Sequence, residues 1–313
     1  MLIVGQENTD SPIEITPDGG TIYAIAFTAN GEHLLSGGDG NIQVWRVEDA
    51  KKIETMEASR GDDVLCLAVS KDGRWIAAGT DEGDVSVWNA ETRKQVWLRE
   101  EHGDEISAVD FSPDATRLVS GSTNGKITIW DISTRKQIQT PNHEPEDWVF
   151  AAKYSPQGDR IATATKEFVR VWNTNDGGLL VTIKVGVTPY LNTGLLWSDN
   201  HLFAISDSKI KQLEASAGSA VSEWAVPTSD EYSCIALPKH GKFIAYSSKR
   251  TVTFWDMTTL AQLNLIEHTE DIRSIAISPD DRFIAFGGGT GNIIIRNLAH
   301  ITVRFVYCWI TVI

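Results

Sequence analysis

The chain has 313 residues, of which 42% are hydrophobic and 22% charged, and these proportions are typical of a soluble globular protein. Its formal net charge of −14 at pH 7 argues against a general nucleic-acid binder, because such a protein needs a basic surface for phosphates. Cys66, Cys234 and Cys308 lie far apart and follow no CxxC spacing, so neither a disulfide framework nor a zinc site is indicated.

The two ends of the sequence carry no clear targeting or membrane signal. Residues 1–5 are too short for a signal peptide and lack a basic region. The apolar segment 301–313 contains Arg304 and is shorter than the about 20 apolar residues that a membrane-spanning helix needs. We therefore expect a cytoplasmic protein that does not bind membranes and is a monomer.

A short pattern recurs along the chain: a turn, an alternating strand and then a tryptophan at the strand end. The tryptophans at this place are Trp45, Trp88, Trp130, Trp172 and Trp255, and Leu213 and Arg296 stand in the corresponding place of two further copies. Consecutive copies are about 42 residues apart, which indicates a repeat array. A catalytic residue has no reason to recur in every repeat, so we interpret these tryptophans as structural.

The repeats divide a single domain, residues 1–313, into seven units. Their approximate bounds are 17–59, 60–100, 101–142, 143–186, 187–227, 228–267 and 268–306. In the third unit, alternating segments such as RLVSGS and KITIWD are separated by turn sequences such as SPDA and TNG. This pattern predicts a four-stranded antiparallel meander in each unit. One such sheet cannot bury both of its faces alone, so the units must stack.

These units resemble the WD-repeat (WD40-type) β-propeller family. The resemblance is carried by FSPDATRLVSGSTNGKITIWD in unit three, AVSKDGRWIAAGTDEGDVSVWN in unit two and AISPDDRFIAFGGGTGNIIIRN in unit seven. It covers about residues 12–306, and unit five is degenerate. It implies an all-β fold, a seven-bladed β-propeller of four-stranded antiparallel blades.

The resemblance also implies a buried polar network in each blade, made of a His, a Ser or Thr, an Asp and the strand-end Trp. The matching residues are His102, Ser120 and Trp130 in unit three, and His143, Thr163 and Trp172 in unit four. Unit three has Asn124 where the family has Asp, and no unit has a complete set. We therefore expect ring closure to depend more on apolar packing than in a consensus propeller.

Residues 12–16 (PIEIT) occupy a fourth-strand position before unit one. In the family, such an N-terminal strand commonly completes the last blade, here by pairing with about residues 293–295. Residues 301–306 are an alternative for the same slot. We favour the N-terminal strand, which leaves 307–313 as a surplus tail.

No motif for a catalytic or cofactor site appears. The glycine-rich GGGTGN (residues 287–292) lacks the Lys-Ser/Thr of a phosphate loop and aligns with a turn of unit two, and HExxH, GxSxG and EF-hand patterns are absent from the sequence. We expect no enzyme activity, no cofactor and no metal.

In a propeller, the loops between blades (d–a) and the b–c turns lie on one face of the ring. The d–a loops are rich in Asp and Glu, with Arg60 nearly their only cation, and aromatic residues stand where the innermost strands begin. The residues predicted to bind a partner are Trp148, Tyr190, Tyr23, Tyr232, Asp104, Glu105, Glu146, Asp147, Glu231 and Asp271. A simpler interpretation is that the acidic loops only keep the protein soluble.

The sequence therefore favours a non-catalytic interaction scaffold or recognition module that binds a Lys/Arg-rich protein or peptide through this acidic face. Two alternatives stay open. One is a propeller enzyme or small-ligand binder that uses the central channel. The other is a structural subunit of a larger assembly, for which large apolar patches on the blade rims would be expected.

Overall fold

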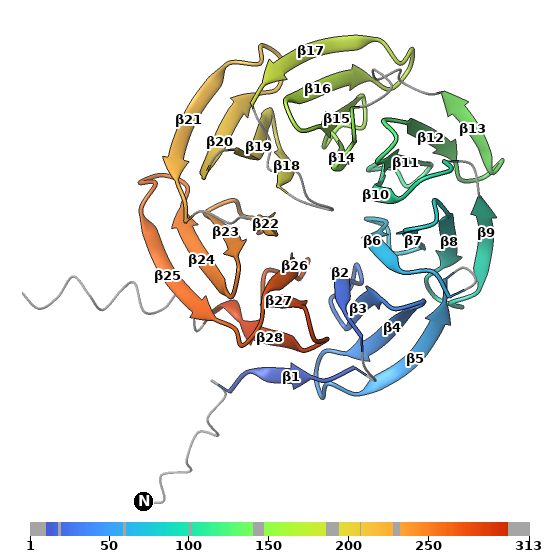
Figure 1. Cartoon of the computed structure of the whole chain (residues 1–313), viewed down its shortest axis with the longest axis vertical. Helices are drawn as coiled ribbons and strands as arrows, with labels where there is room; N and C mark the ends of the chain where they lie inside the picture. Colours follow the sequence, from blue (N-terminus) through green and yellow to red (C-terminus); the bar gives the residue numbers. More distant parts are fainter. Residues whose placement is uncertain are drawn as a thin grey trace, which may run out of the picture.

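The computed structural model describes residues 11–17, 20–58, 61–99, 102–139, 147–185, 194–206, 208–227 and 232–299. Within these ranges, 28 strands form seven four-stranded antiparallel sheets. The sheets are arranged as blades around a central axis, with the first strand of each blade innermost (Figure 1). The predicted all-β, seven-bladed propeller is confirmed. No helix in the described ranges is long and apolar enough to cross a membrane.

Strands a to d of each blade run from the centre outward. Blade 1 contains β2 (Ile22–Phe27), β3 (His33–Gly38), β4 (Asn41–Arg46) and β5 (Lys52–Glu57). Blade 2 contains β6 (Val64–Val69), β7 (Trp75–Thr80), β8 (Val85–Asn89) and β9 (Gln95–Arg99). Blade 3 contains β10 (Ile106–Phe111), β11 (Arg117–Ser122), β12 (Ile127–Asp131) and β13 (Lys136–Gln139).

Blade 4 contains β14 (Ala151–Tyr154), β15 (Arg160–Ala164), β16 (Phe168–Asn173) and β17 (Leu179–Lys184). Blade 5 contains β18 (Leu195–Ser198), β19 (His201–Ser206), β20 (Lys209–Glu214) and β21 (Ala220–Ala225). Blade 6 contains β22 (Ser233–Ala236), β23 (Phe243–Ser248), β24 (Thr251–Asp256) and β25 (Gln262–Glu267). Blade 7 contains β26 (Ile272–Ile277), β27 (Phe283–Gly288), β28 (Ile293–Asn297) and β1 (Ile13–Ile15).

The hydrophobic core lies between neighbouring blades, which is why a single repeat cannot fold alone. Trp130 of blade 3 packs in one buried cluster with Cys66 and Val87 of blade 2. Its ring centroid lies 5.7 Å from that of Trp97, also of blade 2. The strand-end tryptophan of blade 3 therefore buries the apolar face of the blade before it.

Short side chains close the turns on the side of the ring away from the d–a loops. The Ser112 hydroxyl donates to the Asp114 carboxylate at 2.6 Å in an a–b turn. In the c–d turn, Asp131 accepts hydrogen bonds from the Thr134 backbone N–H at 2.7 Å and from the Ser133 hydroxyl at 2.7 Å. Asp131 of the Trp-Asp pair thus stabilises a turn.

The N-terminal strand β1 completes blade 7. It pairs antiparallel with β28 in the register Ile13 to Ile295 and Ile15 to Ile293. Ile15 is buried, and it belongs to the cluster between blades 7 and 1. Because the chain after β1 continues into blade 1, the pairing joins the first and last repeats. Residues 300–313, including the alternative closing segment, lie outside the described residues.

Candidate partner-binding face

The d–a loops and the b–c turns lie at the same end of the ring, which we call the upper face. Backbone hydrogen bonds join them: Asp81 N–H to Asp63 C=O at 3.1 Å in blade 2, and Thr123 N–H to Glu105 C=O at 3.0 Å in blade 3. Their side chains therefore form one surface. Its charge depends on both sets of segments.

Five carboxylates of blades 1 to 3 form a row on the upper face. This acidic arc consists of Asp39, Asp63, Asp81, Asp104 and Glu105. Burial raises the pKa of Asp63, and the charges of Asp81 and Asp39 raise it further. Burial likewise raises the pKa of Glu105, with additional contributions from Asp104 and Asp81. The carboxylates are thus close enough to repel one another, and a cation placed among them would relieve that repulsion.

The acidic arc lacks cation partners among the described residues. None of its five members forms an ion pair with another residue that the structure describes. One carboxylate oxygen of Asp81 is buried and accepts no hydrogen bond from a described residue. Asp39 and Asp81 were missed as binding candidates because the sequence analysis sorted only the d–a loops. The signal was present in the b–c turns GGDGN and GTDEGD.

Two of the acidic residues that were predicted to bind a partner form ion pairs within the chain. The Asp147 carboxylate lies 2.7 Å from the Arg170 guanidinium, and Asp271 lies 3.6 Å from Arg250. The b–c turns of blades 4 and 6 also contain the cations Lys166 and Arg250. The upper face is therefore less uniformly acidic than the d–a loops alone suggested. The acidic arc itself lies over blades 1 to 3.

Among the described residues of the upper face, Trp148 is the most exposed large apolar side chain, at 57%. Its ring lies edge-on to Phe150, with centroids 6.3 Å apart. The preceding residue, Asp147, is held by Arg170, whose guanidinium also stacks 4.9 Å from the Phe168 ring centroid. An exposed indole on a fixed base has the features of an interface anchor.

Tyr23 and Tyr232 surround a cation. The Arg273 guanidinium lies 5.0 Å from the Tyr23 ring centroid and 4.6 Å from that of Tyr232, within the range of a cation–π interaction. Register shifts at Tyr23 and at Arg273 in their innermost strands mark β-bulges, which re-aim these side chains. Both tyrosines are thus half-buried partners of Arg273. Arg273 stands in unit seven at the strand position of Tyr23 and was not among the residues predicted to bind a partner.

Several predicted residues cannot be placed. Tyr190, Glu146, Glu231 and His143 lie outside the described residues.

The interior of blade 3 contains the polar network that the resemblance implied, in altered form. Trp130 Nε1–H donates to Ser120 Oγ at 2.8 Å, and the same oxygen lies 2.7 Å from His102 Nε2. Asn124 Nδ2 donates to the backbone carbonyl of His102 at 2.6 Å, so it does not serve the ring as an Asp would. Burial lowers the pKa of His102 from 6.5 to about 3, so the imidazole is neutral.

The other strand-end tryptophans are also held inside the blades. Trp172 donates to Thr163 Oγ1 at 2.8 Å, and Trp45 donates to Ser36 Oγ at 2.9 Å. Trp255 donates to Thr253 Oγ1 at 3.0 Å, on its own strand. Trp88 is buried. These hydrogen bonds satisfy the indole N–H groups that burial would otherwise leave unpaired.

The described residues offer little for catalysis. No group of three or more His, Cys, Asp and Glu among them is placed to hold a metal ion. Burial raises the pKa of the Cys66 and Cys234 thiols to about 12, so neither forms the thiolate that a nucleophile requires.

Comparisons with known proteins agree with the architecture. A family model described as the IFT122 first beta-propeller matches residues 21–297. The WD repeat and SOCS box-containing protein 1 of Xenopus tropicalis is 33% identical over 81 residues, which are 25% of this chain and 18% of that protein. The small ribosomal subunit protein RACK1 of Brassica napus is 28% identical over 78 residues, 25% of this chain and 23% of that protein. The matches thus span less than a quarter of each relative.

Two solved structures share the fold. A chain of the mitotic checkpoint complex superposes with a TM-score of 0.82 at 17% identity, covering 95% of this chain and 94% of that one. The structure of U3-55K gives a TM-score of 0.81 at 18% identity, covering 94% and 100%. At this identity the likeness shows the fold alone. The family match over residues 21–297 shows that the chain belongs to the IFT122 first β-propeller family of WD40-type propellers.

Proposed function

We propose that this propeller is a non-catalytic recognition module that binds a Lys/Arg-rich segment of another protein through the acidic arc. In this proposal the propeller is a cytoplasmic monomer and needs no cofactor. Its relatives include a WD repeat protein with a SOCS box and RACK1 of the small ribosomal subunit, which support an interaction or scaffold role.

The observation that carries the proposal is the set of close carboxylates without cation partners. Burial raises the pKa of Asp63 and of Glu105, and the neighbouring carboxylates raise both further, which costs free energy in the folded state. A cationic segment placed over the acidic arc offsets the part of that cost that comes from repulsion between the carboxylates. Like charges gathered on one rim also create a field that steers a cationic partner and speeds its association.

Trp148 supplies the second element of the proposal. Exposed ion pairs contribute only about 0–1 kcal/mol each, so charges alone give weak binding. Large aromatic anchors carry much of the energy at protein interfaces. We therefore assign on-rate and salt dependence to the acidic arc, and a slow off-rate to Trp148.

Affinity capture from the source cell tests this assignment. Three baits are compared: the unaltered chain, an arc variant with Asp63→Asn, Asp81→Asn, Asp104→Asn and Glu105→Gln, and a control with Glu48→Gln and Glu91→Gln. The control neutralises exposed acids in c–d turns of the opposite face. A partner retained by the control and lost by the arc variant supports the proposal. Retention by all three baits contradicts it.

A second candidate function rests on the rim of the ring. Outer strands of blades 3 to 6 expose large apolar side chains, namely Ile138, Leu179, Leu180, Val221 and Leu265. Such residues favour a structural subunit whose rim packs against a neighbour. If so, replacing Leu179 and Leu180 by Ser disrupts assembly with that neighbour, measured by sedimentation, while the arc variant assembles normally.

A further inference from the structure

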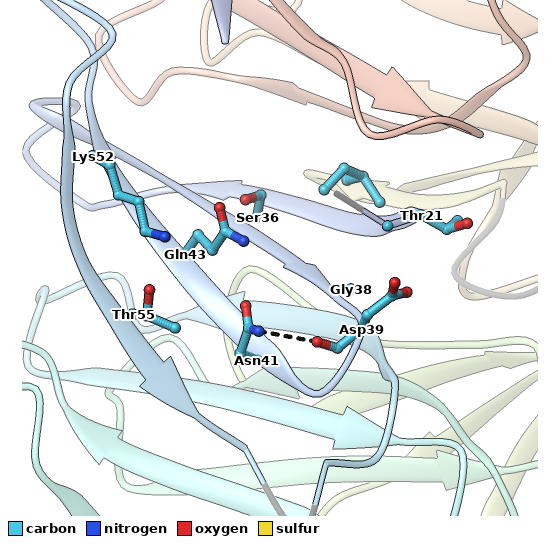
Figure 2. Close-up of a pocket in the computed structure, with 10 residues that line it drawn as sticks. Thr21, Ser36, Gly38, Asp39, Asn41, Gln43, Lys52 and Thr55 are labelled. Carbon is cyan, nitrogen blue, oxygen red and sulfur yellow. Dashed lines mark hydrogen bonds between the residues drawn. The ribbon is translucent and has the colours of Figure 1, made fainter. Parts of the chain in front are cut away.

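Blade 1 contains a polar cavity of about 270 Å³ on the sheet face that bears Trp45. Figure 2 shows its lining: Ser36, Asn41, Gln43, Lys52 and Thr55 come from the three outer strands of the blade. Gly20 forms another part of the wall, and a Cβ on it would collide with the Asp39 carboxylate. Thr55 is exposed, so the cavity opens to solvent beside it.

Two groups in this cavity have unused hydrogen-bonding capacity. Gln43 is only 8% exposed, and its Oε1 accepts no hydrogen bond from a described residue. Ser36 is buried and accepts from Trp45 Nε1, but its own hydroxyl proton has no acceptor among the described residues. Ser36 and Gln43 lie directly opposite each other on neighbouring strands. The cavity thus offers one buried donor beside one buried acceptor.

Blade 3 shows what fills the equivalent place in this chain. Ser120 stands where blade 1 has Ser36, and its cross-strand partner Thr128 stands where blade 1 has Gln43. There the buried imidazole of His102 lies against the serine hydroxyl, and its ring centroid is 6.3 Å from that of Trp130. The residue at the sequence position of His102 in unit one is Asp18, outside the described residues.

The remaining blades fill this place with their own side chains. At the position of Ser36, blades 6 and 7 have the buried rings of Tyr246 and Phe286. Blade 5 has Ala204 there, opposite Lys211, which donates to the Val185 carbonyl at 3.3 Å. Blade 4 places Arg170 opposite Thr163 and pairs it with Asp147. In blade 2, Ser86 accepts a hydrogen bond from Gln95 Nε2 at 3.0 Å. In blade 1 no described side chain fills this place, and a cavity lined by the unsatisfied Gln43 Oε1 remains.

We propose that the blade 1 cavity is a binding site for a neutral imidazole, the side chain of a histidine in a partner segment. A neutral imidazole has one N–H donor and one acceptor nitrogen. The donor satisfies Gln43 Oε1, and the acceptor receives the Ser36 hydroxyl proton. A guanidinium has donors only and a carboxylate has acceptors only, so each leaves one of the two groups unpaired.

The histidine arrives on the segment that lies along the acidic arc, since Asp39 belongs to the arc and also lines the cavity. In this respect the inference rests on the proposed function and refines it: the partner segment is basic and carries a histidine. The cavity itself can be tested without that segment. The lowered pKa of His102 supports the requirement for a neutral ring in such a site.

The test uses 4-methylimidazole, titrated into the full chain above the pKa of the ring and followed by two-dimensional NMR. The side-chain amide signals of Gln43, assigned by their loss in Gln43→Leu, and the Trp45 indole signal are expected to shift saturably. Affinity falls about tenfold in Gln43→Leu, as for the loss of one hydrogen bond to a buried acceptor. It is retained in Gln43→Glu, which keeps an acceptor of the same shape and guards against a folding defect in the leucine variant.

Thr128→Val is the matched control, because it alters the same strand position in blade 3, where His102 occupies the site. It binds 4-methylimidazole as the unaltered chain does. Methylguanidinium and acetate give no saturable shift. The inference is overturned if 4-methylimidazole does not saturate these signals, if Gln43→Leu binds equally well, or if methylguanidinium binds as tightly. Any of these results leaves the test of the acidic arc unaffected, so the two failures can be told apart.

Discussion

Trp130 donates its indole N–H to Ser120 across two neighbouring strands, at 2.8 Å, while the ring itself packs against blade 2. The side chain therefore acts in two places: it satisfies a polar group inside its own blade and buries apolar surface between blades. Neither contact reaches solvent, since Trp130 is 1% exposed. The recurring tryptophan is thus part of the scaffold, and the residues that meet a partner lie elsewhere.

Replacing Trp130 by Ala is expected to lower the free energy of unfolding by about 3–5 kcal/mol, as for other large truncations in a protein core. Trp148→Ala is the matched control, because it removes the same side chain from an exposed position and is expected to leave stability nearly unchanged. Denaturant unfolding of both variants measures the difference. Equal stability losses would contradict the structural role of Trp130.

His102 predicts a specific dependence of stability on pH. Its pKa is lowered from 6.5 to about 3 in the folded chain, so the neutral ring stabilises the fold fully above pH 6.5. The contribution is lost as pH falls from 6.5 toward 3, at about 1.4 kcal/mol per pH unit, because only the unfolded chain takes up the proton.

The variant His102→Gln lacks this proton uptake. The difference in unfolding free energy between the two proteins is therefore expected to shrink as pH falls through that window. Urea titrations at a series of pH values measure it. A difference that stays constant from neutral pH to pH 4 would show that His102 is not held neutral.

The pairing of β1 with β28 predicts which end of the chain matters for stability. Deleting residues 1–17 removes the outer strand of blade 7 and uncovers Ile293 and Ile295, so the melting temperature is expected to fall strongly. Deleting residues 307–313 is expected to change it little. Calorimetry of the two truncations decides the point, and the reverse order would assign ring closure to the C-terminal segment.

Trp148→Ala is expected to raise the dissociation rate of a bound basic segment about tenfold or more, with the association rate nearly unchanged. The physical reason is that an indole contributes short-range contact area, which acts only after encounter. Surface-binding kinetics with the captured partner measure both rates. A change confined to the association rate would remove Trp148 from the interface.

Much of the fold could be predicted because its signals are local. The strand-end tryptophans and their period of about 42 residues mark strand c of each blade, and the spacing of PIEIT before unit one indicated the strand that pairs with β28. In unit five, Leu213 replaces the tryptophan, yet the blade still contains four strands. Periodic strands and turns were sufficient there.

The surface was harder to predict because it is built from residues far apart in sequence. Tyr23 and Arg273 meet only because blades 7 and 1 are joined, and a bulge in each inner strand turns their side chains. Asp39 and Asp81 stand in b–c turns, whereas the charge of this face was predicted from the d–a loops. The ion pair of Asp147 with Arg170 spans a loop and strand c, and sequence spacing gave no sign of it.

The cavity of blade 1 had no sequence signal of its own. Ser36 and Gln43 are ordinary strand residues, and the cavity arises because no described side chain occupies the place that His102 fills in blade 3. Such a cavity is recognised only when the side chains of one repeat are compared with those of the others.

The most direct test of the proposed function is the association rate of an arginine-rich, fluorescently labelled peptide, measured by stopped flow across a salt series. The chain is compared with the arc variant and with the opposite-face control, Glu48→Gln with Glu91→Gln. If the acidic arc steers the partner, the arc variant associates more slowly at low salt and shows a shallower salt dependence, while the control matches the unaltered chain. An arc variant with the unaltered chain's association rate and salt slope would contradict the account, and the acidic arc would then serve only solubility.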